Sequence, residues 1–269
     1  MRSIDDVIRR LDEIVSLCAR ERSRAGYFAA LYRQMTIQVK AGMLAGRFDD
    51  AARMERLDVV FAKRYFEAFD AWRSGRRPTL AWEMAFRASG NRWLAIVQQM
   101  LLGVNAHINL DLGIAAAQVC PGDAIYGLKH DFDEINRIIS GLSGHIMTDI
   151  GEVSPWFALL DRVAGKADQA VVNFSIAVAR REAWRVAEEA APLDPEHLAG
   201  MIERRDREVA TFAGVVRQPG LWGSILTALV ALRERQDVPL VIAALSDQLE
   251  QVPYPATLEE QKTAASSLS

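Results

Sequence analysis

The chain has 269 residues, 50% of them hydrophobic and 25% charged, with a formal net charge of −3 at pH 7. This composition is typical of one large or two small globular domains. The mild acidity argues against a nucleic-acid-binding protein, which usually has a strongly basic face. Two cysteines, Cys18 and Cys120, are too few for a disulfide framework, and the charged N-terminal residues contain no apolar signal segment. We therefore expect a cytoplasmic protein with reduced thiols.

Apolar residues recur at helical spacing along nearly the whole chain, and alternating strand patterns are almost absent. Residues 3–21 place isoleucine, valine and leucine on one stripe, with Ser3 and Asp5 as possible capping residues. Residues 79–90 are expected to form a short helix or a connection. The other predicted helices cover residues 27–45, 51–75, 91–119, 128–141, 166–191, 195–216 and 222–246.

No linker rich in Gly, Ser or Pro and no internal repeat divides these helices. The predicted fold class is therefore all-α. We expect a single multi-helix domain over residues 1–246, with about eight to ten helices packed around a buried central helix at about 92–119. Residues 247–269 are polar and contain prolines, so we expect a loosely ordered C-terminal tail there.

The central segment raises the question of a membrane span, because Asp111 is its only formal charge between Trp93 and Gly122. The same segment also contains glutamines, asparagines and a histidine, which are costly in a lipid environment. A buried helix inside a protein core accommodates these side chains better. We therefore predict no membrane span.

Residues 105–112, NAHINLDL, alternate polar and apolar side chains inside this segment. Strict alternation suits a strand, but the flanking residues are rich in Leu, Ala, Gln and Met, which favour a helix. On a helix the polar residues form two pairs one turn apart, His107 with Asp111 and Asn105 with Asn109. These polar groups need partners, because the remaining faces of the segment are apolar and are expected to be buried.

The His107 and Asp111 pair has a spacing at which an imidazole and a carboxylate can bind one metal ion. The following helix offers His130 as a further ligand, with Asp131 and Glu134 beside it. We therefore predict a divalent metal site for zinc, iron or manganese, with His107, Asp111 and His130 as ligands. Such an ion lowers the pKa of bound water. Asp131 or Glu134 would act as the general base.

The remaining polar residues leave several interpretations open. Asn105 and Asn109 would position the substrate, or would tie the central helix to neighbouring backbone. The His107 and Asp111 pair would satisfy its own hydrogen bonds if no metal binds there. His145 and Asp149 repeat the same spacing and would join the site only if the chain folds back at the glycines between residues 141 and 144.

The strings LLGVNAHINLDLGIAAA, RLDVVFAKRYFEAF and HDFDEIN resemble a mainly bacterial family of unknown function. The resemblance covers most of residues 1–246 and implies a single helical domain without implying a reaction. The pair His107 and Asp111 is also similar to an element of the zinc-dependent phospholipase C and P1-type nuclease group of helical hydrolases. Four histidines are too few for the three-zinc cluster of that group, so one or two ions are implied instead.

Signatures of other enzyme classes are missing: the sequence contains no G-x-S-x-G, no P-loop, no G-x-G-x-x-G and no C-x-x-C. No nucleotide cofactor is therefore predicted. The leading hypothesis is an enzyme, a metal-dependent hydrolase of a small-molecule ester or phosphoester. The first alternative is a metal-free helical enzyme or binding protein for an apolar small molecule, with a large apolar pocket like those of lyases, cyclases or isomerases and with His107 as the catalytic acid or base. The second is a purely structural or interaction protein.

Overall fold

A computed structural model of the chain describes residues 1–135, 137–138, 167–217 and 237–247. Every regular element in these ranges is helical, which confirms the predicted all-α class. The α-helices are α1 (Ile4–Arg20), α2 (Gly26–Leu44), α3 (Ala51–Arg73), α4 (Leu80–Ser89), α5 (Ile96–Val104), α6 (Gly113–Val119), α9 (Ala167–Ala190), α10 (Pro195–Arg217) and α12 (Val238–Asp247). A π-helix (Asn105–Leu112) joins α5 to α6, a 3₁₀ helix (Gly122–Leu128) follows α6, and residues 129–135 and 137–138 are also helical.

The first helices begin where the sequence supplies capping side chains. Ser3 is the capping residue of α1, and its hydroxyl accepts a hydrogen bond of 3.2 Å from the amide of Asp6. Asp50 caps α3 in the same way, accepting from the amide of Arg53 at 2.8 Å. At the other end of α3, Gly75 has a φ of +73°, a conformation that glycine adopts without steric cost. Local sequence thus sets the limits of α1 and α3.

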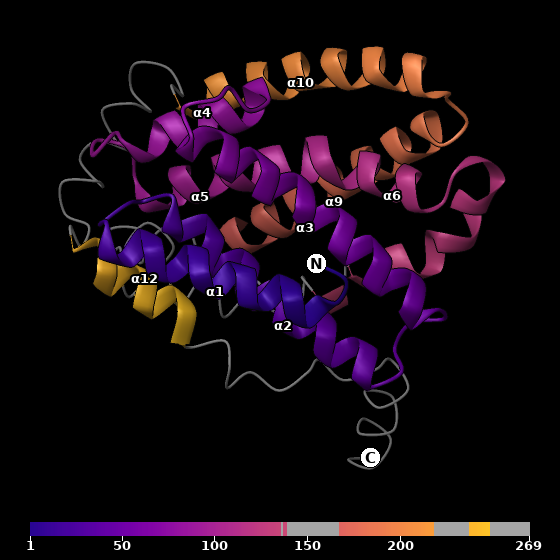
Figure 1. Cartoon of the computed structure of the whole chain (residues 1–269), viewed down its shortest axis with the longest axis horizontal. Helices are drawn as coiled ribbons and strands as arrows, with labels where there is room; N and C mark the ends of the chain where they lie inside the picture. Colours follow the sequence, from indigo (N-terminus) through magenta and orange to yellow (C-terminus); the bar gives the residue numbers. More distant parts are fainter. Residues whose placement is uncertain (136, 139–166, 218–236, 248–269) are drawn as a thin grey trace.

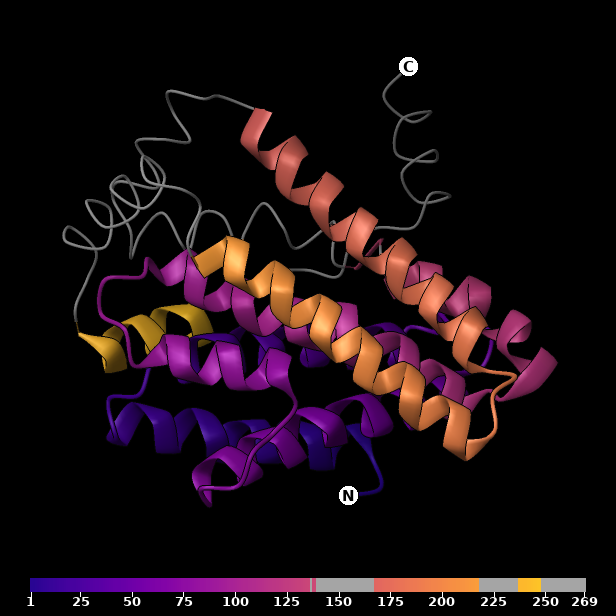
Figure 2. The same cartoon turned by 90° about the horizontal axis from the view of Figure 1, so that it is seen from above.

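The helices are arranged so that the α5–α6 segment runs through the middle of the molecule (Figure 1). α1 packs along α2, and α12 packs against both of them. α10 covers α4, α5 and the π-helix, while α9 packs on α6 and the π-helix. In the view turned by 90°, α1 and α9 lie on opposite sides of the molecule with α5 between them (Figure 2). The central segment therefore meets helices from both halves of the sequence.

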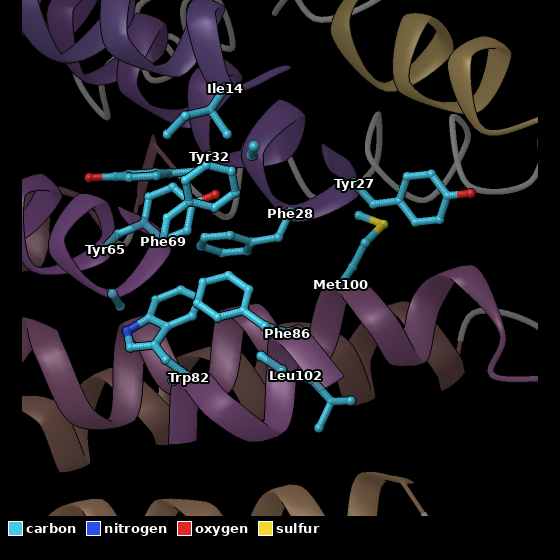
Figure 3. Packing of buried hydrophobic residues seen from close by; sticks show 14 of the residues in the cluster. Ile14, Tyr27, Phe28, Tyr32, Tyr65, Phe69, Trp82, Phe86, Met100 and Leu102 are labelled. Atoms are coloured by element: carbon cyan, nitrogen blue, oxygen red, sulfur yellow. The ribbon is translucent and has the colours of Figure 1, made fainter. Parts of the chain in front are cut away.

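The buried side chains form two hydrophobic clusters. The first lies among α1 to α5, α10 and α12 and is rich in aromatic rings. Figure 3 shows the Phe28 ring between Trp82 and Phe86 on one side and the rings of Tyr32, Tyr65 and Phe69 on the other. The second cluster joins α6, the 3₁₀ helix, α9 and the helical residues that follow Leu128. The polar residues of the central segment lie where these two clusters adjoin.

The central helix differs from its prediction in two respects. It begins at Ile96 rather than at about residue 92, because residues 91–95 form a turn. Its middle, Asn105–Leu112, is a π-helix instead of an α-helix. The helical run Ile96–Val119 is long and apolar enough to be a candidate membrane span. The core helix of a soluble protein meets the same criteria of length and composition. In this structure, 78% of the most apolar window of the run is buried.

Two glycines allow neighbouring helices to approach the central segment closely. A Cβ atom on Gly103 would lie 2.5 Å from the Phe28 ring of α2, and one on Gly113 would lie 2.5 Å from the Ala183 carbonyl oxygen of α9. Both distances are shorter than van der Waals contact, so these positions require the absence of a side chain. The predicted burial of Ala106, Leu110, Gly113 and Ala117 on one face is confirmed.

Several predictions concern residues outside the described ranges. These are the tail after Asp247, the end of the helix predicted over 128–141, and the first part of the helix predicted over 222–246. His145 and Asp149 also lie outside the described residues, so their membership of a site stays a prediction. Cys18 and Cys120 are both described and are buried, free thiols.

Candidate functional site

The two asparagines of the π-helix connect it to itself and to α10. The side-chain amide of Asn109 donates to Asn105 Oδ1 at 2.8 Å, as the predicted one-turn pairing requires. Asn105 Nδ2 donates to the carbonyl of Val209 at 3.0 Å, and Arg205 Nε donates to the carbonyl of Asn109 at 2.9 Å. π-helical turns are rare and occur often at functional sites. The amide groups are thus engaged within the protein, and a role in positioning substrate stays a prediction.

Asp111 lies at the centre of a buried hydrogen-bond network. Its carboxylate is 1% exposed and accepts from Arg64 Nε at 2.8 Å and from the Trp82 indole at 2.7 Å, one donor on each oxygen. Arg64 comes from α3 and Trp82 from α4, so three elements meet at this carboxylate. A buried carboxylate with a guanidinium partner on one oxygen and an indole on the other has little capacity left for other ligands.

His107 lies beside Asp111 inside a set of aromatic rings. Its ring is stacked on Phe61, with centroids 3.6 Å apart, and meets Tyr32 edge-on at 4.3 Å. Phe28 and Trp82 lie further out, at 5.5 and 6.1 Å. The nearest approach to Asp111 is 3.9 Å, beyond hydrogen-bond length, and neither imidazole nitrogen has a hydrogen-bond partner within the described part of the chain.

Burial determines the protonation state of this histidine. Loss of solvation lowers the pKa of His107, and the charge of Arg64 acts in the same direction, against the opposing effect of Asp111. The imidazole is therefore neutral at pH 7, with one nitrogen carrying a proton and the other able to accept one. Buried polar groups without partners are rare in folded proteins, so this ring is an exception that requires a reason.

Other buried polar groups lack partners as well, among them the hydroxyl of Tyr32, whose ring contacts His107, and a carboxylate oxygen of Asp58, whose charge acts on Tyr32. The Tyr32 hydroxyl and Asp58 Oδ2 are both buried and form no hydrogen bond with any described residue. Burial raises the pKa of Asp58 to about 7, and the nearby charge of Glu55 contributes. Burial also raises the pKa of Tyr32, with additional contributions from Asp58 and Asp111. Near neutral pH the site thus combines a neutral imidazole, a phenol and a partly protonated carboxyl group.

The other predicted site residues occupy a different place in the fold. Asp131 is fully buried and accepts from the amide of Asp49 at 2.7 Å and from Arg53 Nη2 at 2.7 Å. Glu134 is equally enclosed and pairs with Arg47, whose Nε lies 3.0 Å away, and with Arg137. These two carboxylates therefore connect the helical residues after Leu128 to the loop before α3 and to the start of α3.

The predicted metal ligands do not converge on one point. Within the described residues, the group of three ligating side chains whose donor atoms lie within 4.8 Å of one another is Asp49, His130 and Asp131. His130 is exposed, and its Nδ1 lies 3.0 Å from Asp49 Oδ2. His107 and Asp111 are not part of this group. The structure thus divides the predicted ligand set between two places, and metal binding itself stays a prediction.

Arg64, Trp82 and Tyr32 were not identified as site residues from the sequence. Arg64 and Trp82 lie 47 and 29 residues from Asp111 along the chain, so no local spacing links them to it. A partial signal exists in α3, where Asp58, Phe61 and Tyr65 share one face of the helix and a buried aspartate is unusual. The pattern indicates which face of α3 is unusual, but it does not identify the residues of α2 and the π-helix that contact this face.

These features define an all-helical protein with an enclosed polar centre lined by aromatic rings. Residues 4–219 match a model whose description is "Family of unknown function (DUF5995)", and the chain belongs to that family. No curated protein and no solved structure matches the chain significantly.

Proposed function

We propose that this protein is a metal-free helical enzyme that binds an apolar small molecule beside His107 and moves a proton on it. The observation that supports this proposal is the His107 imidazole, which is 3% exposed and has no hydrogen-bond partner on either nitrogen among the described residues. An unsatisfied buried polar group costs about 1–3 kcal/mol, and such a cost is commonly retained at functional sites. The aromatic rings around it provide contact surface for an apolar ligand.

The chemistry of the site suits proton transfer. A neutral imidazole with a free nitrogen accepts a proton from a bound substrate, and the Asp58 carboxyl group, with a pKa of about 7, is able to donate one at neutral pH. Environments that move the pKa values of two groups in opposite directions are typical of acid and base partners. Asp111, fixed by Arg64 and Trp82, places a negative charge beside the imidazolium that forms. Isomerases and lyases use this reaction class.

A metal-dependent hydrolase remains the second candidate, and one observation favours it. The donor atoms of Asp49, His130 and Asp131 lie within 4.8 Å of one another. From the sequence, His130 was predicted as a metal ligand and Asp131 as a candidate general base. Against this candidate, Asp131 already accepts hydrogen bonds from two backbone amides and from Arg53. At the His107 site, the guanidinium of Arg64 on Asp111 disfavours a second cation.

The proposal is tested with His107→Phe, which retains an aromatic ring of similar size and removes both nitrogens. We would screen the wild-type protein by ligand-observed NMR against fluorinated phenols and cyclohexanols, which combine an apolar ring with one polar group. Binding that is lost in His107→Phe but retained in His197→Phe supports the proposal, since His197 is an exposed residue on α10. Equal binding to all three proteins would contradict it.

Elemental analysis of untagged protein separates the two candidates. We expect the metal content of wild type and His107→Phe to be the same. Zinc, iron or manganese that is present at about one equivalent and disappears in His107→Phe would support the metal-dependent hydrolase instead. Loss of the same metal in His130→Ala alone would place the ion at the Asp49, His130 and Asp131 group.

A further inference from the structure

A buried charged residue with an unpartnered donor lies outside the His107 site, on α9. Arg180 is 2% exposed, and its Nη2 donates to the carbonyl of Phe132 at 2.9 Å. The centre of its guanidinium lies 4.6 Å from the centroid of the Phe132 ring, which meets the Trp184 ring edge-on. Arg180 is thus enclosed between α9 and the helical residues that follow Leu128, among the apolar side chains of the second cluster.

No carboxylate in the described part of the chain balances the charge of Arg180. No ion pair connects it to any acid in the described ranges, and its Nε has no hydrogen-bond partner there. Burial lowers the pKa of Arg180 to about 9, which still leaves the group protonated at neutral pH. A buried arginine normally has an anionic partner, because its fork of donors matches an oxyanion and its desolvation is otherwise uncompensated.

The acidic residues of the helical segment that carries Phe132 are already paired. Residues 129–138 contain three carboxylates, and each has a basic partner from elsewhere in the structure or from the same helix. The pairs are Asp131 with Arg53, Asp133 with Lys129, and Glu134 with Arg47 and Arg137. Asp133 acts on Arg180 only as a distant charge, since its carboxylate is about half exposed and bound to Lys129. No carboxylate of this helix is left over to balance Arg180.

We propose that Arg180 is the recognition residue of a second binding site, which takes the carboxylate or phosphate group of a small molecule between α9 and residues 129–138. Arg180 Nε and the rest of the guanidinium fork would donate to the oxyanion, while Phe132 holds the plane of the fork in place by stacking and through its carbonyl. The surrounding apolar side chains strengthen this attraction by excluding water.

The test compares wild type, Arg180→Met and Arg181→Met during thermal unfolding. Arg181 is the adjacent residue on α9 and is exposed, so its substitution controls for the loss of one positive charge. The probes are inorganic phosphate and acetate, each compared with sodium chloride at equal ionic strength. Phosphate stabilises many proteins nonspecifically, so the difference between variants is the relevant quantity.

We expect phosphate, acetate or both to raise the Tm of wild type and Arg181→Met by several degrees, and to leave Arg180→Met unaffected. Without oxyanion, Arg180→Met should be at least as stable as wild type, because the variant no longer buries an unpaired charge. A response to phosphate alone identifies a phosphorylated ligand, and a response to acetate alone identifies a carboxylate.

Two results would overturn the proposal. The first is an equal rise of Tm in Arg180→Met, which would place the anion elsewhere. The second is a wild type that responds to neither probe beyond sodium chloride. If Arg180→Met does not fold, Arg180→Lys keeps the charge but loses the fork, and we expect it to retain a weaker response. An Arg180→Lys response equal to that of wild type would contradict recognition by the guanidinium.

Discussion

The His107 imidazole lies flat against the ring of Phe61, with the two planes only 11° apart. Phe61 is itself only partly buried, whereas His107 and the other rings around it are enclosed. Phe61 is thus the most exposed of the aromatic rings that contact His107. We expect rotation of the Phe61 ring to admit a ligand more readily than movement of Tyr32, Trp82 or Phe28, because these three are buried in the first hydrophobic cluster.

Phe61→Ala should therefore expose His107 to reagents in solution. We expect diethyl pyrocarbonate to leave His107 unmodified in the wild type and to modify it readily in the variant, as measured by peptide mass spectrometry. The exposed His130 and His197 serve as internal standards, since they should react equally in both proteins. Phe212→Ala, which removes an exposed ring from α10, is the matched control and should leave His107 protected. Rapid modification of His107 in the wild type would show that Phe61 does not cover it.

Asp58 should make the protein less stable as the pH rises from about 4 to 7. Its pKa is near 3.8 in the unfolded chain and about 7 in the folded protein, so over this interval the unfolded chain binds fewer protons. Stability contributed by the protonated form is fully present at low pH and is lost as the pH approaches 7. The total difference is up to about 4 kcal/mol, at about 1.4 kcal/mol for each pH unit between the two pKa values.

Asp58→Asn isolates this effect, because it keeps the shape of the side chain and does not ionise. In urea unfolding at pH 5, 6, 7 and 8, the free energy of unfolding of the variant should increase relative to that of the wild type as the pH rises. His107, whose pKa is lowered, contributes in the opposite sense below about pH 6.5, but it is common to both proteins and cancels in the comparison. A difference between the two proteins that does not change with pH would mean that Asp58 is ionised in the folded state.

Asp111→Ala should destabilise the protein by about 3–5 kcal/mol, because it leaves the Arg64 guanidinium and the Trp82 indole without their buried acceptor. Asp133→Ala is the control: its pair with Lys129 is about half exposed and should contribute at most about 1 kcal/mol. In a double-mutant cycle, Arg64→Met combined with Asp111→Leu should cost less than the sum of the two single changes. Additive costs would show that Arg64 and Asp111 do not interact.

The sequence predicted the elements of this fold better than it predicted the relations between them. Three predictions depend on residues a few positions apart, and all three are confirmed: the apolar stripe from Ile4 to Cys18, the Ser3 cap and the pairing of Asn105 with Asn109. The π-helical turn was not predicted. Its pattern of polar residues fits an α-helix equally well, and its contacts with α10 come from Val209 and Arg205, about 100 residues away.

The candidate site was predicted only in part for the same reason, because sequence spacing does not show contacts between distant residues. His107 and Asp111 were recognised from their spacing, but Arg64 and Trp82 are joined to Asp111 only by tertiary packing. His130 and Asp131 were grouped with His107 on the assumption that the central helix and the next helix lie side by side, with these residues at the same level along the helix axes. In the structure, residues 129–135 instead direct Asp131 toward the loop before α3, where the amides of Asp49 and Asp50 bind it. Helical spacing alone contains no information on that choice.

Glycine substitutions test how closely the helices approach the central segment. Gly103→Ala and Gly113→Ala should both destabilise the protein, because the added methyl would lie 2.5 Å from Phe28 Cγ in the first case and 2.5 Å from the Ala183 carbonyl oxygen in the second. We expect about 1–3 kcal/mol for Gly103→Ala by urea unfolding, with a change in the environment of the aromatic rings visible by near-UV circular dichroism. Gly200→Ala, at an exposed position of α10 with open space around it, should instead stabilise the protein by about 0.5–1 kcal/mol. A neutral Gly103→Ala would mean that the Phe28 ring moves freely, and the rings around His107 would then form a looser enclosure than the contacts between them indicate.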